Sequence, residues 1–160
     1  MKQPDSIARK VAISGIFMAS YIALMFLTQS FSFGQYQIRI ATSLYAFSSL
    51  FPFLILPSGL ANALSNTLMG GLGIADIIGG LVVGLLTSSS IVLIRKLNLP
   101  RFLIIFPIIF IPGLGVPLYL HILLDLPYWV LATSVIIGQI IPAFIGYLLV
   151  ITLEKRLSRS

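Results

Sequence analysis

Three short clusters hold nine of the ten basic residues of this chain, and apolar stretches long enough to cross a bilayer run between them. The clusters are at the N-terminus (Lys2, Arg9, Lys10), in mid-chain (Arg95, Lys96, Arg101) and at the C-terminus (Lys155, Arg156, Arg159). Loops rich in lysine and arginine stay on the cytoplasmic side of a membrane, so neighbouring clusters must be separated by an even number of crossings. This parity constrains the topology more tightly than hydropathy does.

The composition places the chain in a membrane. Hydrophobic residues make up 58% of the sequence and charged residues 9%, whereas a soluble domain has about 25% charged residues. We therefore predict an all-α integral membrane protein. The net charge of +6 does not indicate a nucleic-acid partner, because the basic residues flank apolar segments and do not alternate with polar or aromatic ones.

Hydropathy marks apolar segments at residues 7–28, 40–73, 74–94, 102–120 and 128–153. A single crossing by residues 40–73 would carry the mid-chain cluster to the side opposite the N-terminus, which the charge rule rejects. We therefore predict that this run turns. The sequence Leu56-Pro57-Ser58-Gly59 is the expected turn, because proline disfavours helix in the residue before it and glycine follows closely.

The predicted protein is a single transmembrane domain over residues 1–160, with six helices and both termini in the cytoplasm. Its external segments would be residues 30–39, 70–76 and 119–128. The two helices of the 40–73 hairpin would have about 17 and 14 residues and reach about 25 and 21 Å, less than the roughly 30 Å hydrocarbon core. We expect them to be tilted, bent or covered.

Motifs for catalysis and ion coupling are missing from the sequence. The glycine-rich run at 70–73 is followed by Ile74 and Ala75 and not by Lys and Ser/Thr, so it is not a phosphate-binding loop. The acidic residues are Asp5, Asp76, Asp125 and Glu154, which form no buried proton relay. His121 and Asp125 are four residues apart, a spacing more typical of a helix-end pair than of a metal site. We expect no enzyme, no cofactor and no bound metal.

Polar residues near the predicted external side are candidates for ligand binding. Arg39 is the single basic residue there, and it either snorkels to the membrane surface or contacts a ligand. Gln35 and Gln37 precede it, and a Gln and an Arg two apart in an extended loop offer donors and acceptors to a planar heterocycle. Gln139, inside the last apolar segment, needs a partner in another helix or in a ligand.

Two asparagines add to these candidates. Asn62 and Asn66 share one helix face. For Asn62 we favour a hydrogen bond between helices over a ligand role. Asn66 lies near the outer end, ten residues before Asp76, and both side chains are placed to line an external cavity.

Small residues recur every four positions in the first apolar segment, at Gly15, Ala19 and Ala23. Such a stripe lets two helices approach closely. The partner is either another helix of this chain or a second membrane protein, and the sequence leaves both open.

Several of these residues together resemble the QueT family, the membrane-embedded substrate-binding S components of energy-coupling factor (ECF) transporters. The resemblance lies in Ser32-Phe33-Gly34, in Gln37-Ile38-Arg39, in the stretch from Asn66 through the glycine run to Asp76, and in Gly138 and Gly146. It covers most of the chain and is strongest over residues 30–90.

The resemblance implies an S component with six helices in the cell membrane of a bacterium. Such a protein captures a queuosine precursor from outside and works with a transmembrane coupling subunit and two cytoplasmic ATPases. The substrate site would include Gln37, Arg39, Asn66, Asp76 and Gln139. Gly15, Ala19 and Ala23 would dock the coupling subunit.

The sequence departs from the family pattern at three places. Thr42 and Gln139 stand where the family has glutamates, and Ile111-Pro112-Gly113 occupies a region where an asparagine is expected. A carboxylate would pair with the aminomethyl cation of a 7-deazaguanine precursor, so these departures favour a neutral or differently decorated ligand. A self-contained secondary transporter or channel and a membrane scaffold are the alternative functions.

Overall fold

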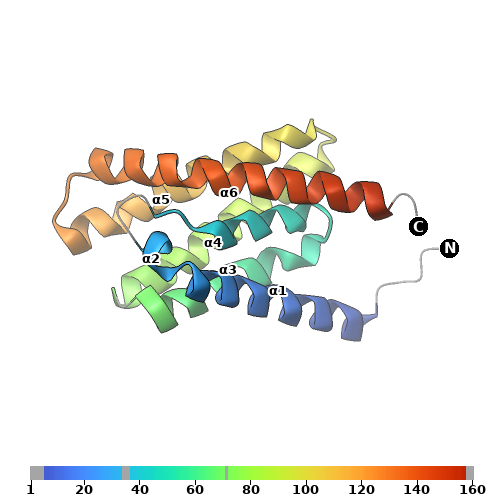
Figure 1. The fold of residues 1–160 in the computed structure, drawn as a ribbon, viewed down its shortest axis with the longest axis horizontal. Helices are drawn as coiled ribbons and strands as arrows, with labels where there is room; N and C mark the ends of the chain where they lie inside the picture. The colour runs from blue at the N-terminus through green and yellow to red at the C-terminus, as the bar shows by residue number, and fades with distance from the viewer. Residues whose placement is uncertain (1–5, 34–36, 71, 158–160) are drawn as a thin grey trace.

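The computed structural model describes residues 6–33, 37–70 and 72–157, and within these ranges every regular element is helical (Figure 1). The α-helices are α1 (Ile7–Leu27), α2 (Gln29–Ser32), α3 (Ile55–Ser65), α4 (Ile74–Lys96), α5 (Ile105–Leu124) and α6 (Tyr128–Leu157). Between them lie the 3-10 helices η1 (Ile40–Ser49), η2 (Pro52–Leu54) and η4 (Arg101–Ile104), and a π-helical turn, η3 (Asn66–Gly70).

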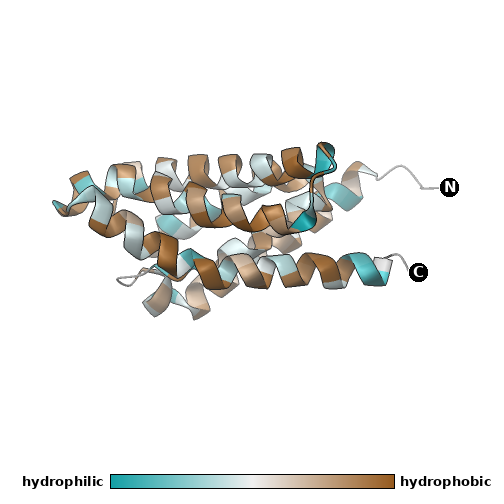
Figure 2. Ribbon diagram, turned by 90° about the horizontal axis from the view of Figure 1, so that it is seen from above, coloured by the Kyte–Doolittle hydropathy of each residue, from teal (hydrophilic) through white to brown (hydrophobic). Residues whose placement is uncertain are grey.

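In the described part of the chain, four helical segments are long and apolar enough to cross a membrane: Ile7–Leu27, Ile74–Lys96, Arg101–Leu124 and Tyr128–Arg156. Large apolar side chains on their outer faces are exposed, among them Ile16 and Phe26 on α1 and Leu118 on α5. In Figure 2 hydrophobic residues dominate the middle of the bundle, and the most hydrophilic residues gather toward its ends. The chain is therefore a multi-pass membrane protein, and the four segments agree with those expected from hydropathy.

The run from 40 to 73 does turn back on itself, as the charge parity predicted. In Figure 1, η1 runs through the bundle toward the end that holds the start of α1, and α3 returns beside α1 and α4. At 2.0 Å per residue η1 spans about 20 Å, so neither arm of this hairpin is as long as the four candidate spans. Six crossings therefore remain a prediction.

The predicted position of the turn is wrong. The chain turns at Leu50 and Phe51, before Pro52, which begins η2. Pro57 instead lies in the first turn of α3, where a proline is tolerated because the N–H groups there have no partner within the helix.

Gly59 is likewise a packing residue and not a turn residue. A Cβ atom on Gly59 would lie 2.9 Å from the carbonyl oxygen of Leu81, and one on Gly84 would lie 2.8 Å from the Cα of Gly59. The two glycines therefore let α3 and α4 approach backbone to backbone, which small residues achieve in membrane proteins.

The centre of the bundle is η1, which packs against α1, α4 and α6 and is almost entirely buried. Its long 3-10 form is accompanied by hydroxyl groups that bond to the carbonyl three residues earlier: Thr42 to Arg39, Ser48 to Tyr45 and Ser49 to Ala46. Tyr45 stacks on Tyr21 of α1 with ring centres 5.5 Å apart and hydroxyls 3.0 Å apart. This contact fixes α1 against the middle of the protein.

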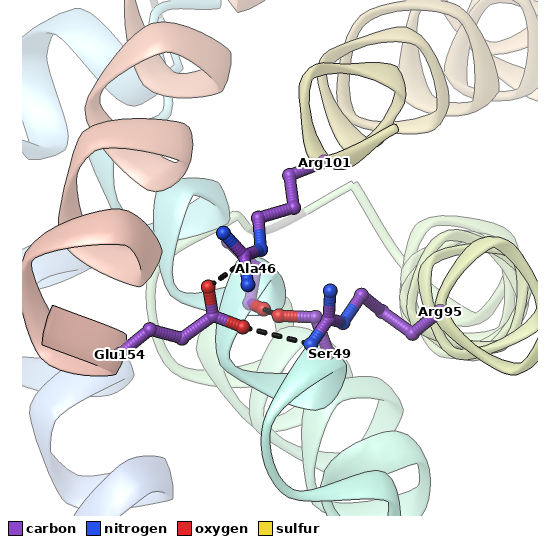
Figure 3. A network of polar contacts seen from close by, with 5 residues as sticks. All are labelled: Ala46, Ser49, Arg95, Arg101 and Glu154. Carbon is purple, nitrogen blue, oxygen red and sulfur yellow. Dashed lines mark hydrogen bonds and ion pairs between the residues drawn. The ribbon is translucent and has the colours of Figure 1, made fainter. Parts of the chain in front are cut away.

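The described residues of the three basic clusters belong to elements at one end of the molecule, where α1 begins and where α4 and α6 end (Figure 1). Figure 3 shows Glu154 of α6 between two arginines: Arg95 Nη2 donates to it at 2.8 Å, and Arg101 Nε forms an ion pair at 2.7 Å. Lys10 of α1 lies 6.0 Å from the centre of the Phe53 ring, next to the turn of the hairpin. The described members of the predicted clusters thus lie at the same end of the fold, whereas Lys2 and Arg159 lie outside the described residues.

We expect thiol labelling to show which end faces the cytoplasm. The chain has no cysteine, so Ser30→Cys and Leu99→Cys give single reporters at exposed sites near opposite ends. A membrane-impermeant reagent should label Ser30→Cys in intact cells, and Leu99→Cys only after permeabilisation. Labelling of Leu99→Cys but not Ser30→Cys in intact cells would contradict the predicted orientation.

Candidate functional site

A cavity of about 490 Å³ opens at the end of the bundle opposite the basic clusters. Described residues of three connections that the sequence predicts to be external contribute to its lining: Gln37 and Arg39 before η1, Gly70 and Leu72 before α4, and Leu126 of the α5–α6 turn. Its lining residues are Phe33, Gln37, Arg39, Gly70, Leu72, Asp76, Leu120, Leu124, Leu126, Val130, Leu131 and Ser134. Arg39 and Asp76 are the charged members of this set.

Arg39 is buried, with 4% of its surface exposed, so the snorkelling interpretation is wrong. Its Nη1 donates to Asn62 Oδ1 and to Asn66 Oδ1, both at 3.2 Å, and its guanidinium lies 5.0 Å from the centre of the Phe33 ring. Arg39 is thus held at the start of η1 by Asn62 of α3, by Asn66 of η3 and by the ring of Phe33. Its Nε has no hydrogen-bond partner among the described residues.

Asp76 is even more buried, at 1% exposure, although it lies in the first turn of α4. Its Oδ1 accepts from Asn66 Nδ2 at 3.0 Å and from Tyr119 Oη at 3.3 Å. These two donors belong to η3 and α5, so the carboxylate joins the start of α4 to two other elements. Its Oδ2 has no hydrogen-bond partner in the described part of the chain.

Asn66 links the cation to the anion. Its amide oxygen accepts from Arg39, and its amide nitrogen donates to the carboxylate and to the main-chain oxygen of Asp76. A Cβ atom on Gly80 would lie 2.6 Å from Asn66 Nδ2 and 3.1 Å from Asn62 Oδ1, so only glycine on α4 leaves room for both amides. Asn66 therefore orients the two charged residues from behind the cavity.

Gln139 lies beneath the cavity, at 1% exposure, and outside its lining. Its Oε1 is 2.7 Å from the Thr42 hydroxyl, and its Nε2 donates to the main-chain oxygen of Gln37 at 3.4 Å. Gln37 has φ of 45°, in the left-handed region that costs energy for a residue other than glycine. Thr42 and Gln139, the two positions at which the family resemblance led us to expect glutamates, are thus direct partners, and Gln139 also supports the backbone of Gln37.

Of the five predicted substrate-binding residues, Gln37, Arg39 and Asp76 line the cavity, whereas Asn66 and Gln139 support them from outside it. The predicted neighbour Gln35 lies outside the described residues, as do Gly34 and Gly71 of the resemblance. Phe33 and Tyr119 were not predicted as site residues. The sequence does hint at Phe33, because an aromatic residue six positions before an arginine can pack against its guanidinium group. No pattern in the sequence indicates that Tyr119 contacts Asp76.

His121 lies in the last turn of α5. Its Nδ1 lies 2.9 Å from the Pro117 carbonyl oxygen, and Asp125 ends the same helix in the left-handed conformation. Over the described ranges, no group of three or more His, Cys, Asp or Glu side chains lies together.

The small-residue stripe of α1 is on the outside of the bundle. Gly15, Ala19 and Ala23 are exposed, whereas the opposite face of the helix buries Phe17, Tyr21 and Met25. A Cβ atom on Gly15 would meet nothing within 4 Å. The structure therefore contradicts the alternative in which the stripe packs against another helix of this chain.

Three buried polar atoms on residues that line the cavity have no hydrogen-bond partner among the described residues: Gln37 Oε1, Arg39 Nε and Asp76 Oδ2. Leaving such a group unpaired costs about 1 to 3 kcal/mol, so they are placed to accept two hydrogen bonds and donate one to a bound molecule. The cavity volume falls in the range of about 300 to 1,000 Å³ that is typical of small-molecule sites.

Over the described residues the chain is an all-helical membrane protein with a buried, charged cavity at one end, an arrangement typical of proteins that bind or transport small molecules in the bilayer. The sequence profile of the QueT transporter family matches residues 11–155. The chain therefore belongs to the QueT family, whose members are S components of ECF transporters. No match was found among curated proteins or among solved structures.

Proposed function

We propose that this protein is the substrate-binding S component of an ECF-type importer and binds a queuosine precursor of the 7-deazaguanine type from outside the cell. Membership of the QueT family supports the transport role. The observation that carries the choice of ligand is the set of three unpaired polar atoms on Gln37, Arg39 and Asp76.

The edge of a guanine-type ring complements these atoms. It carries one carbonyl acceptor, one ring N–H donor and one exocyclic amino donor. The carbonyl would accept from Arg39 Nε, and the two donors would bond to Asp76 Oδ2 and Gln37 Oε1. An adenine-type edge, with one donor group and a ring-nitrogen acceptor, would leave one of the two protein acceptors unpaired.

The charges of the cavity favour a neutral ligand. Arg39 and Asp76 balance each other, and Asn66 joins them through hydrogen bonds. The residues beneath, Thr42 and Gln139, are uncharged and pair with each other at 2.7 Å. A ligand with an aminomethyl cation would bring an extra buried charge with no counterion of its own, which is costly in an apolar surrounding. A 7-deazaguanine with a neutral substituent fits better.

The proposed partners are a transmembrane coupling subunit and two cytoplasmic ATPases, which would supply the energy that this chain has no motif to provide. The exposed stripe of Gly15, Ala19 and Ala23 supports docking to the coupling subunit, because small residues on an outer helix face allow close contact with a partner helix. The proposed location is the bacterial cell membrane, with the cavity open to the outside.

Mass spectrometry of the gently purified protein tests this proposal. We expect a retained ligand whose mass and fragments contain a 7-deazaguanine ring without an aminomethyl group. Protein with Asp76→Ala, prepared in parallel, should retain much less of it. A retained ligand with an unrelated ring, or equal retention by both proteins, would contradict the proposed site.

A further inference from the structure

Tyr119 reaches from α5 to the carboxylate of Asp76 on α4. Its hydroxyl donates to Asp76 Oδ1 at 3.3 Å, although the two residues are 43 positions apart in the sequence. Its ring lies directly on Gly79, one turn after Asp76. A Cβ atom on Gly79 would lie 2.2 to 2.7 Å from three carbon atoms of that ring, so a larger residue there would displace it.

The hydroxyl of Tyr119 is one of two donors on the same carboxylate oxygen. Asn66 Nδ2 also donates to Oδ1, from η3 on the other side. With both donors on Oδ1, rotation of the carboxyl group would break two hydrogen bonds, so the other oxygen is held in place. That oxygen, Oδ2, is the buried atom without a partner, and it lies 2.6 Å from where a Cβ of Gly70, another lining residue, would be.

From this geometry we infer that Tyr119 is a positioning residue for ligand binding: by holding Asp76 Oδ1, it directs Oδ2 into the cavity as the acceptor for a ligand N–H group. The inference rests on the proposed function of the cavity. Tyr119 is not itself among the lining residues, so its effect on the ligand passes through Asp76. The competing interpretation is a hydrogen bond that only joins α4 to α5.

A double-mutant cycle in ligand affinity separates the two interpretations. The purified protein and its Tyr119→Phe, Asp76→Ala and doubly substituted variants are titrated with 7-deazaguanine. Tyr119→Phe keeps the ring on Gly79 and removes the donor, and it should weaken binding by about threefold to tenfold. In the Asp76→Ala background the same change should have no further effect on affinity. Equal losses in both backgrounds would overturn the inference.

One control variant and one further test variant are titrated in the same way. Tyr128→Phe also removes a tyrosine hydroxyl that bonds to α5, since Tyr128 Oη donates to the Leu114 carbonyl at 3.0 Å, but it should leave the affinity unchanged. Gly79→Ala displaces the Tyr119 ring while keeping its hydroxyl, and it should weaken binding about as much as Tyr119→Phe. An unchanged affinity in Gly79→Ala would count against the inference. If the unmodified protein does not bind 7-deazaguanine, the proposed function fails and the inference fails with it.

Discussion

Replacing Asp76 by alanine is expected to weaken the binding of 7-deazaguanine by at least about tenfold, measured by titration of the purified protein. The physical reason is that the ligand would lose the acceptor Oδ2 for one buried N–H group, at a cost of about 1 to 3 kcal/mol and more for a charged partner. The change would also leave Asn66 and Tyr119 without their shared acceptor and Arg39 without its neighbouring negative charge.

Asp76→Asn sharpens this test. Because Asn66 and Tyr119 both donate to Oδ1, the amide oxygen must take that position, and the amide nitrogen then replaces Oδ2. A donor would face the donor of the ligand, so we expect binding to be weakened about as strongly as in Asp76→Ala. The competing account treats Asp76 as a charge at the start of α4, worth about 0.3 to 1 kcal/mol of helix stability. Unchanged affinity in both variants, with only a lower Tm, would support that account.

Introducing phenylalanine at Ala19 or Ala23 is expected to prevent copurification of the protein with the coupling subunit and the ATPases. A bulky side chain on the small-residue face would hold the partner helix away, and overpacking of this kind costs about 1 to 3 kcal/mol. The affinity for the ligand should not change, because both alanines are exposed on the face of α1 opposite Tyr21 and outside the lining of the ligand cavity.

Leu86→Phe is the matched control for this prediction. Leu86 is 54% exposed on α4, so the substitution adds a bulky apolar group to a different outer face of the bundle. It should leave both assembly and ligand binding intact. If Ala23→Phe assembles as well as Leu86→Phe does, the stripe of α1 faces lipid and not the coupling subunit.

Hydropathy and charge were sufficient to predict the long helices and the presence of a hairpin between residues 40 and 73. The hairpin followed from parity, which depends on where lysines and arginines lie along the whole chain and not on local propensity. The position of the turn within this hairpin did not follow from parity. Pro52, Pro57 and Gly59 are all residues of the kind that end helices, and only the tertiary structure shows that the chain turns at Leu50 and Phe51, directly before Pro52. Pro57 and Gly59 lie inside α3, where Gly59 meets α4.

The sequence was sufficient to name most residues of the candidate site, but it did not show how their side chains are arranged around the cavity. Arg39 and Asp76 stand out by themselves, because each is a charged residue next to an apolar segment, and such a residue needs a function or a partner. Which residues reach the cavity, and which stand behind it, depends on how far apart η1, α4, α5 and α6 lie. Gln139 and Tyr119 show this, since one contacts Gln37 across 102 positions and the other contacts Asp76 across 43.

The sequence by itself determined that the chain is a membrane protein, that its basic clusters belong at one end and that Arg39 and Asp76 are charged candidates for a site. Each of these conclusions follows from the cost of placing charge in a hydrocarbon layer, which any single residue experiences. Only the tertiary structure decided the position of the turn, the exposure of the α1 stripe and the pairing of Asp76 with Tyr119. These features depend on close contacts between distant segments, where one missing Cβ atom, as at Gly79 or Gly80, decides whether two side chains can meet.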